Sequence, residues 1–398
     1  MTATRDKKTQ LIIECGVVQT RSALVDNGEV TRLWIGPALG DEGLDQTPFA
    51  GHHFFGRVTS INASLNAAFV DLGDGGEGFL PLNKKLAALL SEGIAIRVEI
   101  KSPPRQGKGG VVSFVSADAS NDDSLGKCPP FDSPVVDAIT EIGAVAGEIV
   151  IDHGGAVSSL RSRSLDIEIS HYTDTVPLFT AFGVESVFEA VFERFVDLVG
   201  GGRLVIDEAQ ALTAIDVDTA GLSASSSERL REKIAIAAAH ESVRQIRLRQ
   251  IGGHVVVDFP RLKSDTSRKR FTELLRKTMS QIEGAGAFSF SKSGLFSMTV
   301  PHRNLSFSEQ FTEIDSQYPI PGRCFTLDWQ AKMAINRLEN RLQASPASRI
   351  QLCLSEALFN YIQTKDSWID RLEERYSVRF ELVLDNKRMT SHFEISEQ

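Results

Sequence analysis

Three aspartates at the ends of apolar runs are the residues of this chain whose type and spacing could do chemistry. Asp216 and Asp218 follow the run Leu212–Ile215, and Gly221 closes the segment. Side chains alternate along an extended strand, so the two carboxylates would project from the same face. Burying an unpaired charge is strongly unfavourable, so each carboxylate needs a partner, a metal ion or water.

The third aspartate, Asp258, ends a second apolar run, Gly253–Val257, about forty residues further along the chain. If the two strands are neighbours in one sheet, Asp216 and Asp258 end side by side at its edge. Two converging carboxylates with room for water suit Mg²⁺, which takes one or two protein carboxylates and keeps several waters. Each Asp alone could instead cap a turn or a helix, because Asp is common at both positions. The pair favours the metal interpretation.

Basic residues gather in the two segments that flank Asp258. A long helix is predicted over residues 226–250, with Ser225 and Glu228 as its capping box, and a second helix with an apolar stripe follows Asp258. The basic residues are Arg244, Arg247, Arg249, Arg261, Lys263, Arg268, Lys269, Arg270, Arg276 and Lys277. Positive charge beside metal-binding carboxylates would draw in a polyanion. A solvated helix face with ordinary surface charge is an equal alternative.

Composition limits the class of protein. The chain has 398 residues, enough for two or three domains, with a net charge of −9 that argues against a general nucleic-acid-binding protein. Its four cysteines are scattered, so neither a zinc site nor a disulfide framework is indicated. Without a secretory signal or an apolar stretch of membrane-spanning length, we expect a cytoplasmic protein with no membrane partner. Nucleophile-elbow, P-loop and HExxH motifs are missing from the sequence.

Residues 51–117 have the pattern of a small β-barrel. Five short apolar runs separated by Gly-rich turns are typical of the OB type. Such barrels bind single strands by stacking bases on exposed aromatic side chains beside basic residues. Phe69, Phe79 and Lys108 are the candidates here. The alternative for either phenylalanine is an ordinary core position, because Phe is commonly buried.

The remaining segments alternate between linkers and α/β patterns. Residues 118–146 are polar and punctuated by Pro and Gly, which predicts a linker. Helical apolar spacing predicts a helix over Ser186–Leu198. Strand, turn and strand are predicted within 288–302, where Lys292 in the turn could meet a phosphate. A Pro-rich connection and a small α/β end domain with three helices follow.

Several of these segments resemble the ribonuclease E/G family. In the central region the matching runs are GRLVID, EAQALTAIDVD, RQIRLRQIGGHVVVDF and SFSKSGLFSM, which lie between Gly202 and Met298. The barrel run GRVTSINASLNAAFVDLG, followed by GFLPL, is similar to that family's S1 domain. The ending from Leu358 onward is similar to its small C-terminal domain.

The resemblance implies an α+β multidomain fold in which an RNase H-like piece carries an inserted S1 barrel of the OB type. A DNase I-like α/β catalytic domain and a small α/β C-terminal domain complete it. The implied boundaries are 1–50 and 147–192 for the RNase H-like piece, 51–117 for the S1 barrel, 118–146 for a linker in place of the family's 5′-sensor, 193–308 for the catalytic domain, 309–325 for a connecting link and 326–398 for the C-terminal domain.

The resemblance also implies an activity, a Mg²⁺-dependent endoribonuclease that hydrolyses phosphodiester bonds in single-stranded RNA. The family's metal-binding aspartates match Asp216 and Asp258, and Asp218 would orient a water or a ligand. Its RNA-contacting S1 residues match Phe69, Phe79 and Lys108. The alternative function is a catalytically inactive RNA-binding protein on the same scaffold.

Three departures from the family pattern qualify that expectation. The family has Asn where this chain has Asp218, and a third carboxylate could tighten metal binding or repel phosphate. Tyr318-Pro-Ile-Pro stands where the family has its zinc-binding CPxC link, so we expect no zinc. Any homodimer through the C-terminal domain would then not be zinc-bridged. The 5′-sensor segment is replaced by the linker, which argues against recognition of a 5′-monophosphate.

Overall fold

A computed structural model of the chain describes residues 9–41, 47–105, 108–117, 124–128, 139, 147–162, 167–219, 228–291, 293–315, 322–377, 379–385 and 393–397. It divides into two compact units. Unit 1 comprises Met1–Asp45, Asp132–Glu189 and Phe311–Gln398, and unit 2 comprises Gln46–Phe131 and Ala190–Gln310. Among the helices of the described ranges, none has the length and apolar character required to cross a bilayer.

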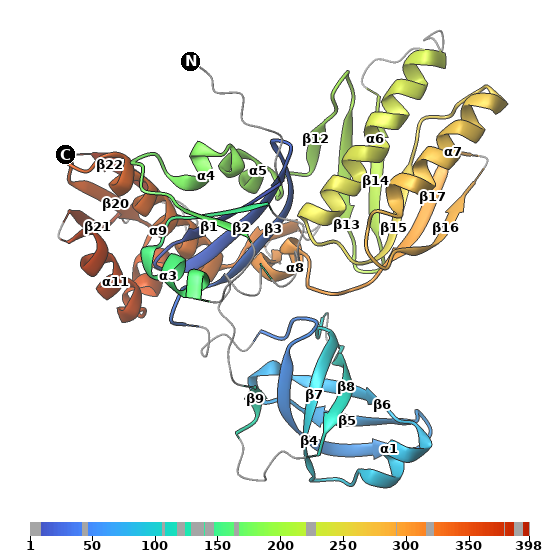
Figure 1. Cartoon of the computed structure of the whole chain (residues 1–398), viewed down its shortest axis with the longest axis horizontal. Helices are drawn as coiled ribbons and strands as arrows, with labels where there is room; N and C mark the ends of the chain where they lie inside the picture. Colours follow the sequence, from blue (N-terminus) through green and yellow to red (C-terminus); the bar gives the residue numbers. More distant parts are fainter. Residues whose placement is uncertain are drawn as a thin grey trace. The chain divides into compact units, whose positions relative to one another are not determined.

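Unit 1 contains a five-stranded sheet in the order β11-β10-β1-β2-β3 (Figure 1). Its strands are β1 (Gln10–Cys15), β2 (Gln19–Asp26), β3 (Glu29–Pro37), β10 (Glu148–Ile151) and β11 (Glu168–His171). β1, β2 and β3 form an antiparallel meander, and β10 and β11 add in parallel beside β1. Two segments that are more than a hundred residues apart in sequence therefore share one sheet, because β1 is buried between β2 and β10.

The rest of unit 1 is a smaller α/β layer around a three-stranded sheet in the order β21-β20-β22. Its helices pack their apolar faces on that sheet, and the core includes Trp368, Leu338 and Leu352. Around this sheet, formed by β20 (Ile350–Leu354), β21 (Phe380–Leu384) and β22 (Phe393–Glu397), lie α9 (Leu327–Ala344), α10 (Glu356–Gln363) and α11 (Asp366–Tyr376). α3 (Gly154–Ser162) and α4 (Leu178–Ala181) instead contact the five-stranded sheet, and α5 (Val184–Ala190) follows α4. β18 (Thr312–Asp315) and β19 (Gly322–Phe325) form a separate two-stranded sheet. The three helices predicted from the sequence near the C-terminus match α9, α10 and α11.

Unit 2 contains the barrel predicted for residues 51–117. Its strands are β4 (His53–Asn62), β5 (Ala67–Asp71), β6 (Glu77–Pro81), β7 (Ala95–Ser102) and β8 (Gly110–Ser116), joined by η1 (Gly73–Gly75) and α1 (Lys84–Leu89). The order β5-β6-β8-β7-β4 closes because β4 also pairs with β5. A further strand, β9 (Gly126–Lys127), pairs with Phe54 and Phe55 of β4. β9 lies inside the stretch predicted as a linker, most of which is outside the described residues.

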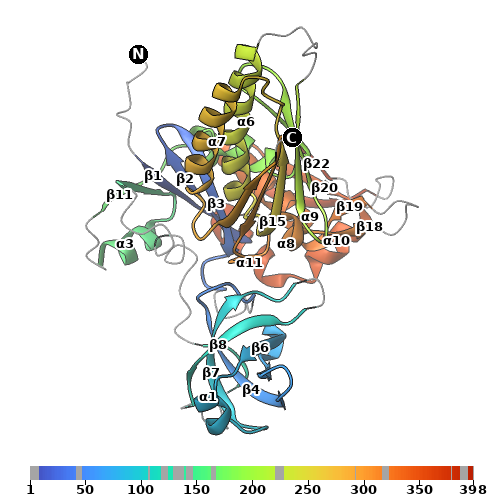
Figure 2. The same ribbon diagram turned by 90° about the vertical axis from the view of Figure 1, so that its right-hand side faces the viewer.

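The second part of unit 2 is a six-stranded sheet in the order β12-β13-β14-β15-β17-β16. The strands are β12 (Phe195–Asp197), β13 (Arg203–Glu208), β14 (Thr213–Asp218), β15 (Gly253–Asp258), β16 (Gly286–Phe290) and β17 (Leu295–Val300). Two helices, α6 (Glu228–Leu248) and α7 (Asp265–Met279), lie side by side on one face of this sheet (Figures 1 and 2). A short helix, α8 (Phe307–Phe311), follows β17. Apolar side chains of both long helices and of alternate strand positions form one core.

The helix predicted over Ser186–Leu198 is wrong in its second half. α5 ends at Ala190, and Phe195–Asp197 instead forms β12, which pairs with Val205, Leu204 and Arg203 of β13. The apolar residues at 191–196 fit helical spacing as well as they fit a strand. Backbone hydrogen bonds to the edge of the six-stranded sheet decided the outcome, and a distant edge of this kind cannot be read from a local pattern.

Buried carboxylates lie where the small α/β layer of unit 1 meets the end of β1. Asp152 Oδ1 accepts from the backbone N–H of Cys15 at 2.8 Å, and Glu339 Oε2 accepts from that of Val17 at 3.0 Å. Arg375 donates to the Cys15 carbonyl at 2.8 Å and to Glu339 Oε1 at 3.1 Å. Burial, which disfavours the charged form, raises the pKa of Asp152 to about 7. It also raises the pKa of Glu339 to about 7, and Arg375 opposes this only in part.

These shifts predict that unit 1 loses stability as the pH rises from about 4 to about 7. The folded state binds the protons of Asp152 and Glu339 more tightly than the unfolded chain does, so its advantage is complete below the unfolded pKa values and is lost through about pH 7. All three tryptophans, Trp34, Trp329 and Trp368, belong to unit 1, so tryptophan fluorescence during urea unfolding reports on this unit. In the double variant Asp152→Asn, Glu339→Gln we expect a flatter pH profile. An unchanged slope in that variant would contradict the assignment.

Candidate active site

The six-stranded sheet brings Asp216 and Asp258 together. β14 and β15 are parallel neighbours, and their register makes Asp216 and Asp258 direct Cα partners. Both strands have the alternation expected of a sheet with one buried face, since Ile215, Val217 and Val257 are buried. Paired residues on adjacent strands project from the same face. The two aspartates, separated by about forty residues of chain, therefore stand side by side on the exposed face.

The exposed face carries the candidate chemistry because α6 and α7 occupy the other one. These helices bury Ile234, Ala238, Phe271 and Leu275 against the sheet, which directs the alternate side chains of β14 and β15 outward. On the outward face Asp216 is flanked in register by Val205 of β13. Asp258 is flanked by Leu295 of β17, which is 44% exposed. Two carboxylates are thus set in a row between apolar neighbours.

This donor set fits a single hard cation. Neighbouring strands are about 4.8 Å apart, and Mg²⁺ binds oxygen at about 2 Å, so two carboxylates across one strand gap can reach the same ion. Like charges at this spacing repel, and a shared cation relieves that repulsion. Within the described ranges, no group of three His, Cys, Asp or Glu side chains is close enough to form a metal site. Two protein carboxylates with the remaining positions taken by water or phosphate is the arrangement that Mg²⁺ commonly adopts.

Asp218 lies one pleat beyond Asp216 on the same face and is engaged by an arginine. Arg203 of β13 is its register partner and donates to Asp218 Oδ2 through Nε and a terminal nitrogen, both at 3.0 Å. The guanidinium carbon of Arg203 also lies 4.8 Å from the centre of the Phe195 ring. The negative charge of Asp218, which the sequence places beside the Asp216–Asp258 carboxylate pair, is therefore offset by Arg203. Sequence reasoning missed Arg203, whose signal was an Arg in the strand before Asp218.

The basic residues of α6 and α7 do not surround the aspartates. Both helices lie on one face of the sheet (Figure 2) and bury their apolar stripes against it. Their charged side chains are therefore on the side of the sheet opposite Asp216 and Asp258. Arg249 is buried and donates to the Glu193 carbonyl at 2.7 Å and to Gln245 Oε1 at 2.8 Å. The interpretation of these residues as a positive surface beside the carboxylates is wrong. Among the described residues, Arg203 pairs with Asp218, and Arg261, a member of the predicted basic set that follows β15, lies at the turn beside Asp258.

The turn between β16 and β17 approaches Asp258 closely. Gly294 has φ +104°, a left-handed conformation that favours glycine, and a Cβ added there would stand 2.7 Å from the Phe259 carbonyl oxygen and 3.8 Å from Asp258 Oδ1. Arg261 Nε donates to the Ser293 carbonyl at 3.0 Å and ties the same turn to the end of β15. The absence of a side chain at Gly294 thus allows the turn to pack beside the aspartate.

We expect Gly294→Ala to impair any chemistry at Asp258. The added methyl must displace the Phe259 carbonyl, and the alanine must keep a backbone φ that is strained for any residue with a Cβ. Together these cost about 1–3 kcal/mol. A shift of the β15 end by a fraction of an ångström would move one of the two carboxylates. The rate of a reaction catalysed at this carboxylate pair should fall by roughly tenfold or more. Gly286→Ala on β16 is the control, because a Cβ there meets nothing within 4 Å. Equal cleavage by both variants would contradict this reading of the turn.

The barrel places Phe69 and Phe79 on its outer surface. The two residues are register partners on β5 and β6, and their rings meet edge to face with centroids 5.9 Å apart. Their neighbours Ala68, Val70 and Leu80 are buried in the barrel core, so the phenylalanine side chains point the other way and stay partly exposed. An aromatic pair on an outer strand surface is the arrangement on which bases stack.

Of the two lysines predicted to contact RNA, the structure describes Lys108 and does not describe Lys292. Lys108 is exposed in the turn before β8, where its backbone exchanges hydrogen bonds with Arg105 at 2.9 and 3.0 Å. β8 pairs with β6 at Gly78↔Gly110 and Phe79↔Val111, so Lys108 lies three residues along the chain from the partner of Phe79. Lys292, in the turn before β17, lies outside the described residues.

The fold and site define a class, an α/β protein with a closed barrel of the S1/OB type and a sheet that presents a carboxylate pair. A family model described as the ribonuclease E/G family matches residues 141–302, which include the whole of β13 to β17. Ribonuclease E of Escherichia coli (strain K12) is 26% identical over 260 residues, which are 63% of this chain and 24% of that protein. Ribonuclease G of the same organism is 32% identical over 136 residues, 33% of this chain and 27% of that protein.

Residues 141–302, less than half of the chain, are therefore similar to the ribonuclease E/G family. The matched stretches span about a quarter of the length of these curated relatives.

Proposed function

We propose that the protein is a Mg²⁺-dependent endoribonuclease that hydrolyses phosphodiester bonds in single-stranded RNA. The observation that carries the proposal is the register of β14 and β15, which pairs Asp216 with Asp258 on an exposed sheet face. The match of residues 141–302 to the ribonuclease E/G family model supports the choice of RNA as the substrate. The relatives named above are ribonucleases, and the region that matches the family model carries both aspartates.

In this proposal the chain's own residues bind the metal ion and orient a water and the RNA. Asp216 and Asp258 would hold one Mg²⁺ through their carboxylate oxygens. When bound, the ion supplies Lewis-acid stabilisation of the scissile phosphate and a more acidic water. Asp218 would orient a water, while its pairing with Arg203 limits repulsion of the phosphate.

The RNA strand would be gripped by the barrel. Phe69 and Phe79 would each stack an unpaired base, and Lys108 would contact a backbone phosphate. Lys292 would contact a further phosphate. Stacking and phosphate contacts tolerate any sequence, so they suit capture of single strands more than selection of a particular site.

The proposed domain scheme follows the family. Sheet β11-β10-β1-β2-β3 would be the RNase H-like piece, whose chain leaves after β3 and returns at β10, with the S1 barrel inserted between them. Residues 193–308, with the six-stranded sheet, would be the DNase I-like catalytic domain. Residues 326–398 would be the C-terminal domain, through which any homodimer would form without zinc.

A Mg²⁺ titration with labelled single-stranded RNA tests the proposal. We expect no fragments in EDTA and cleavage that rises and saturates as Mg²⁺ is added, because the carboxylates alone offer no electrophile. Zn²⁺ should not substitute. RNA binding without fragments at any Mg²⁺ concentration, by a clean preparation, would favour the alternative, an RNA-binding protein on an inactive scaffold. Absence of both binding and cleavage would refute both functions.

A further inference from the structure

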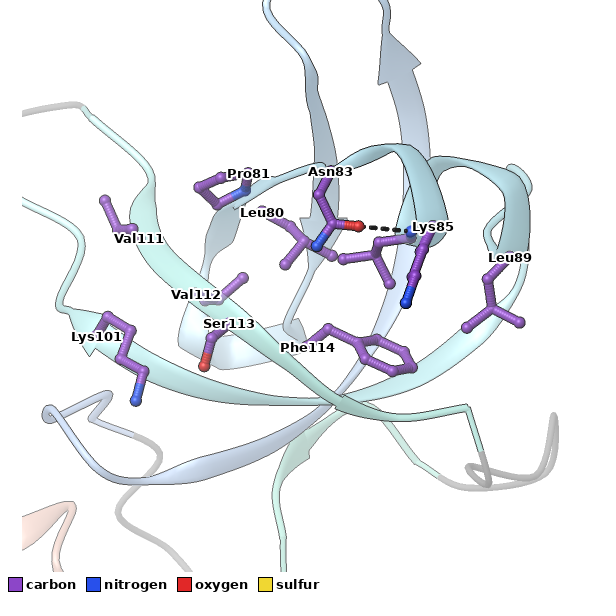
Figure 3. Close-up of a pocket in the computed structure, with 11 residues that line it drawn as sticks. Leu80, Pro81, Asn83, Lys85, Leu89, Lys101, Val111, Val112, Ser113 and Phe114 are labelled. Atoms are coloured by element: carbon purple, nitrogen blue, oxygen red, sulfur yellow. Dashed lines mark hydrogen bonds between the residues drawn. The ribbon is translucent and has the colours of Figure 1, made fainter.

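The barrel contains a pocket of about 560 Å³ at the place where β6 and β8 separate (Figure 3). The two strands are paired in register only at Gly78↔Gly110 and Phe79↔Val111. Beyond that point Leu80 and Pro81 of β6 and Val112 and Ser113 of β8 line the opening. α1 supplies the remaining wall. A volume of this size is within the range of ordinary ligand pockets.

The walls of the pocket are apolar and partly aromatic. Leu80 and Val112 belong to the barrel core and form the floor, while Phe114 is only partly buried. α1 buries none of its residues, and Leu89, which lines the pocket, is 53% exposed. In Figure 3, Leu89 and Lys85 project from α1 toward the ring of Phe114. An exposed leucine opposite a phenylalanine ring offers two faces between which a flat group can lie.

Positive charge stands at the rim. Lys85 of α1 and Lys101 of β7 both line the pocket. Lys101 Nζ lies 2.6 Å from Glu99 Oε1, a pair that is substantially exposed to solvent. Asn83 and Ser113 add polar groups, and Asn83 Oδ1 accepts the Leu86 backbone N–H at 2.9 Å, which fixes the start of α1. The apolar and aromatic walls of the pocket suit a flat group, and the lysines at its rim suit an anionic group attached to it.

The pocket is continuous with the aromatic pair on the outer barrel face. Val111 is the register partner of Phe79 across β6 and β8 and is also a lining residue of the pocket. Phe79 is in turn the register partner of Phe69. A strand of nucleic acid stacked on Phe69 and Phe79 therefore meets Val111 and then the pocket if it continues in the same direction across the sheet.

We propose that this pocket takes one unpaired nucleotide of the RNA strand that stacks on Phe69 and Phe79. The base lies between Leu89 and Phe114, and the adjoining phosphates face Lys85 and Lys101. The inference rests on the proposed function of the barrel in binding RNA. It extends the RNA path beyond the two phenylalanines, and it makes the length of the single strand a determinant of affinity.

Fluorescence anisotropy with the full chain in EDTA, where cleavage is stopped, tests the pocket. The probes are labelled oligouridines of about four and about twelve nucleotides, which bracket the site size of such barrels. Lys85→Met removes a rim charge and keeps the side-chain stem. Lys84→Met is the matched control, since Lys84 is the adjacent exposed residue of α1 and is not among the lining residues.

For Lys85→Met we expect roughly fivefold weaker binding of the longer oligonucleotide, and a salt dependence (log Kd against log salt) shallower by about 0.7, the share of one phosphate contact on a single strand. Lys84→Met should bind like wild type. A 4-thiouridine oligonucleotide should cross-link to peptides that contain residues 80–89 or 111–114. Equal weakening of RNA binding by both lysine variants, or no change in either, would contradict the proposal that the pocket binds a nucleotide. The proposed function of the whole chain would be unaffected. Failure of the wild-type chain to bind either oligonucleotide would instead refute the proposed function.

Discussion

Asp216→Asn is expected to abolish RNA cleavage while RNA binding persists, and Asp258→Asn should do the same. Each substitution removes one charge from the pair that shares the register position on β14 and β15, and it keeps the size of the side chain. A metal site contributes several kcal/mol of transition-state stabilisation, so the cleavage rate should fall by roughly a thousandfold or more. The measurement is single-turnover cleavage of a labelled single-stranded oligonucleotide, with binding followed in parallel by anisotropy.

Asp207→Asn is the matched control for these two variants. Asp207 lies on the same face, opposite Ala214, where Arg194 holds it by hydrogen bonds at 2.6 and 2.8 Å and lowers its pKa. That exposed pair is no part of the proposed metal site, so cleavage should stay within about twofold of wild type. If Asp216→Asn and Asp258→Asn cut as fast as Asp207→Asn, the carboxylate pair is not the active site. If all three lose RNA binding, the fold rather than the chemistry has been damaged.

Arg21→Met is expected to destabilise unit 1 by about 3–5 kcal/mol, the largest effect that we expect outside the site. Arg21 is 1% exposed, and its guanidinium donates to Glu185 at 2.9 and 3.0 Å and also to Glu14. Its central carbon lies 4.5 Å from the ring of Phe179 and 4.8 Å from that of Phe188. Removal of the cation leaves the largely buried carboxylates of Glu14 and Glu185 without their main partner. Urea unfolding followed by tryptophan fluorescence measures the loss.

Two further variants distinguish a buried charge network from mere packing. Arg337→Met is the matched control, because Arg337 pairs with Glu189 at 3.0 Å and lies 5.6 Å from the Phe393 ring, but both charged side chains are about half exposed. Its loss should change the free energy of unfolding by less than about 1 kcal/mol. Placing Arg21→Met in a Glu14→Gln, Glu185→Gln background should recover part of the loss. Equal destabilisation in the two backgrounds would show that the effect comes from packing alone.

Local patterns predicted much of the fold correctly. The five barrel strands, the long helix α6 and the three C-terminal helices all agree with the structure to within a few residues, because each has an unbroken apolar period and strong turn residues at its ends. The prediction failed at Ser186–Leu198, where the apolar spacing is ambiguous and pairing with β13 converts the second half to strand. It also missed β20, whose short run Ile350–Leu354 becomes a strand only between β21 and β22.

The sequence by itself determined that Asp216 and Asp218 share a face, because alternation is a property of any extended strand. It also determined the apolar stripes that hold α6 and α7 on a sheet. Only the tertiary structure decided that β14 and β15 are adjacent and in the register that pairs Asp216 with Asp258, that Arg203 offsets Asp218, and that the helical arginines face away from the site. These depend on which strands become neighbours and which sheet face the helices cover. Both are set by burial of the whole core, and no local stretch of sequence encodes them.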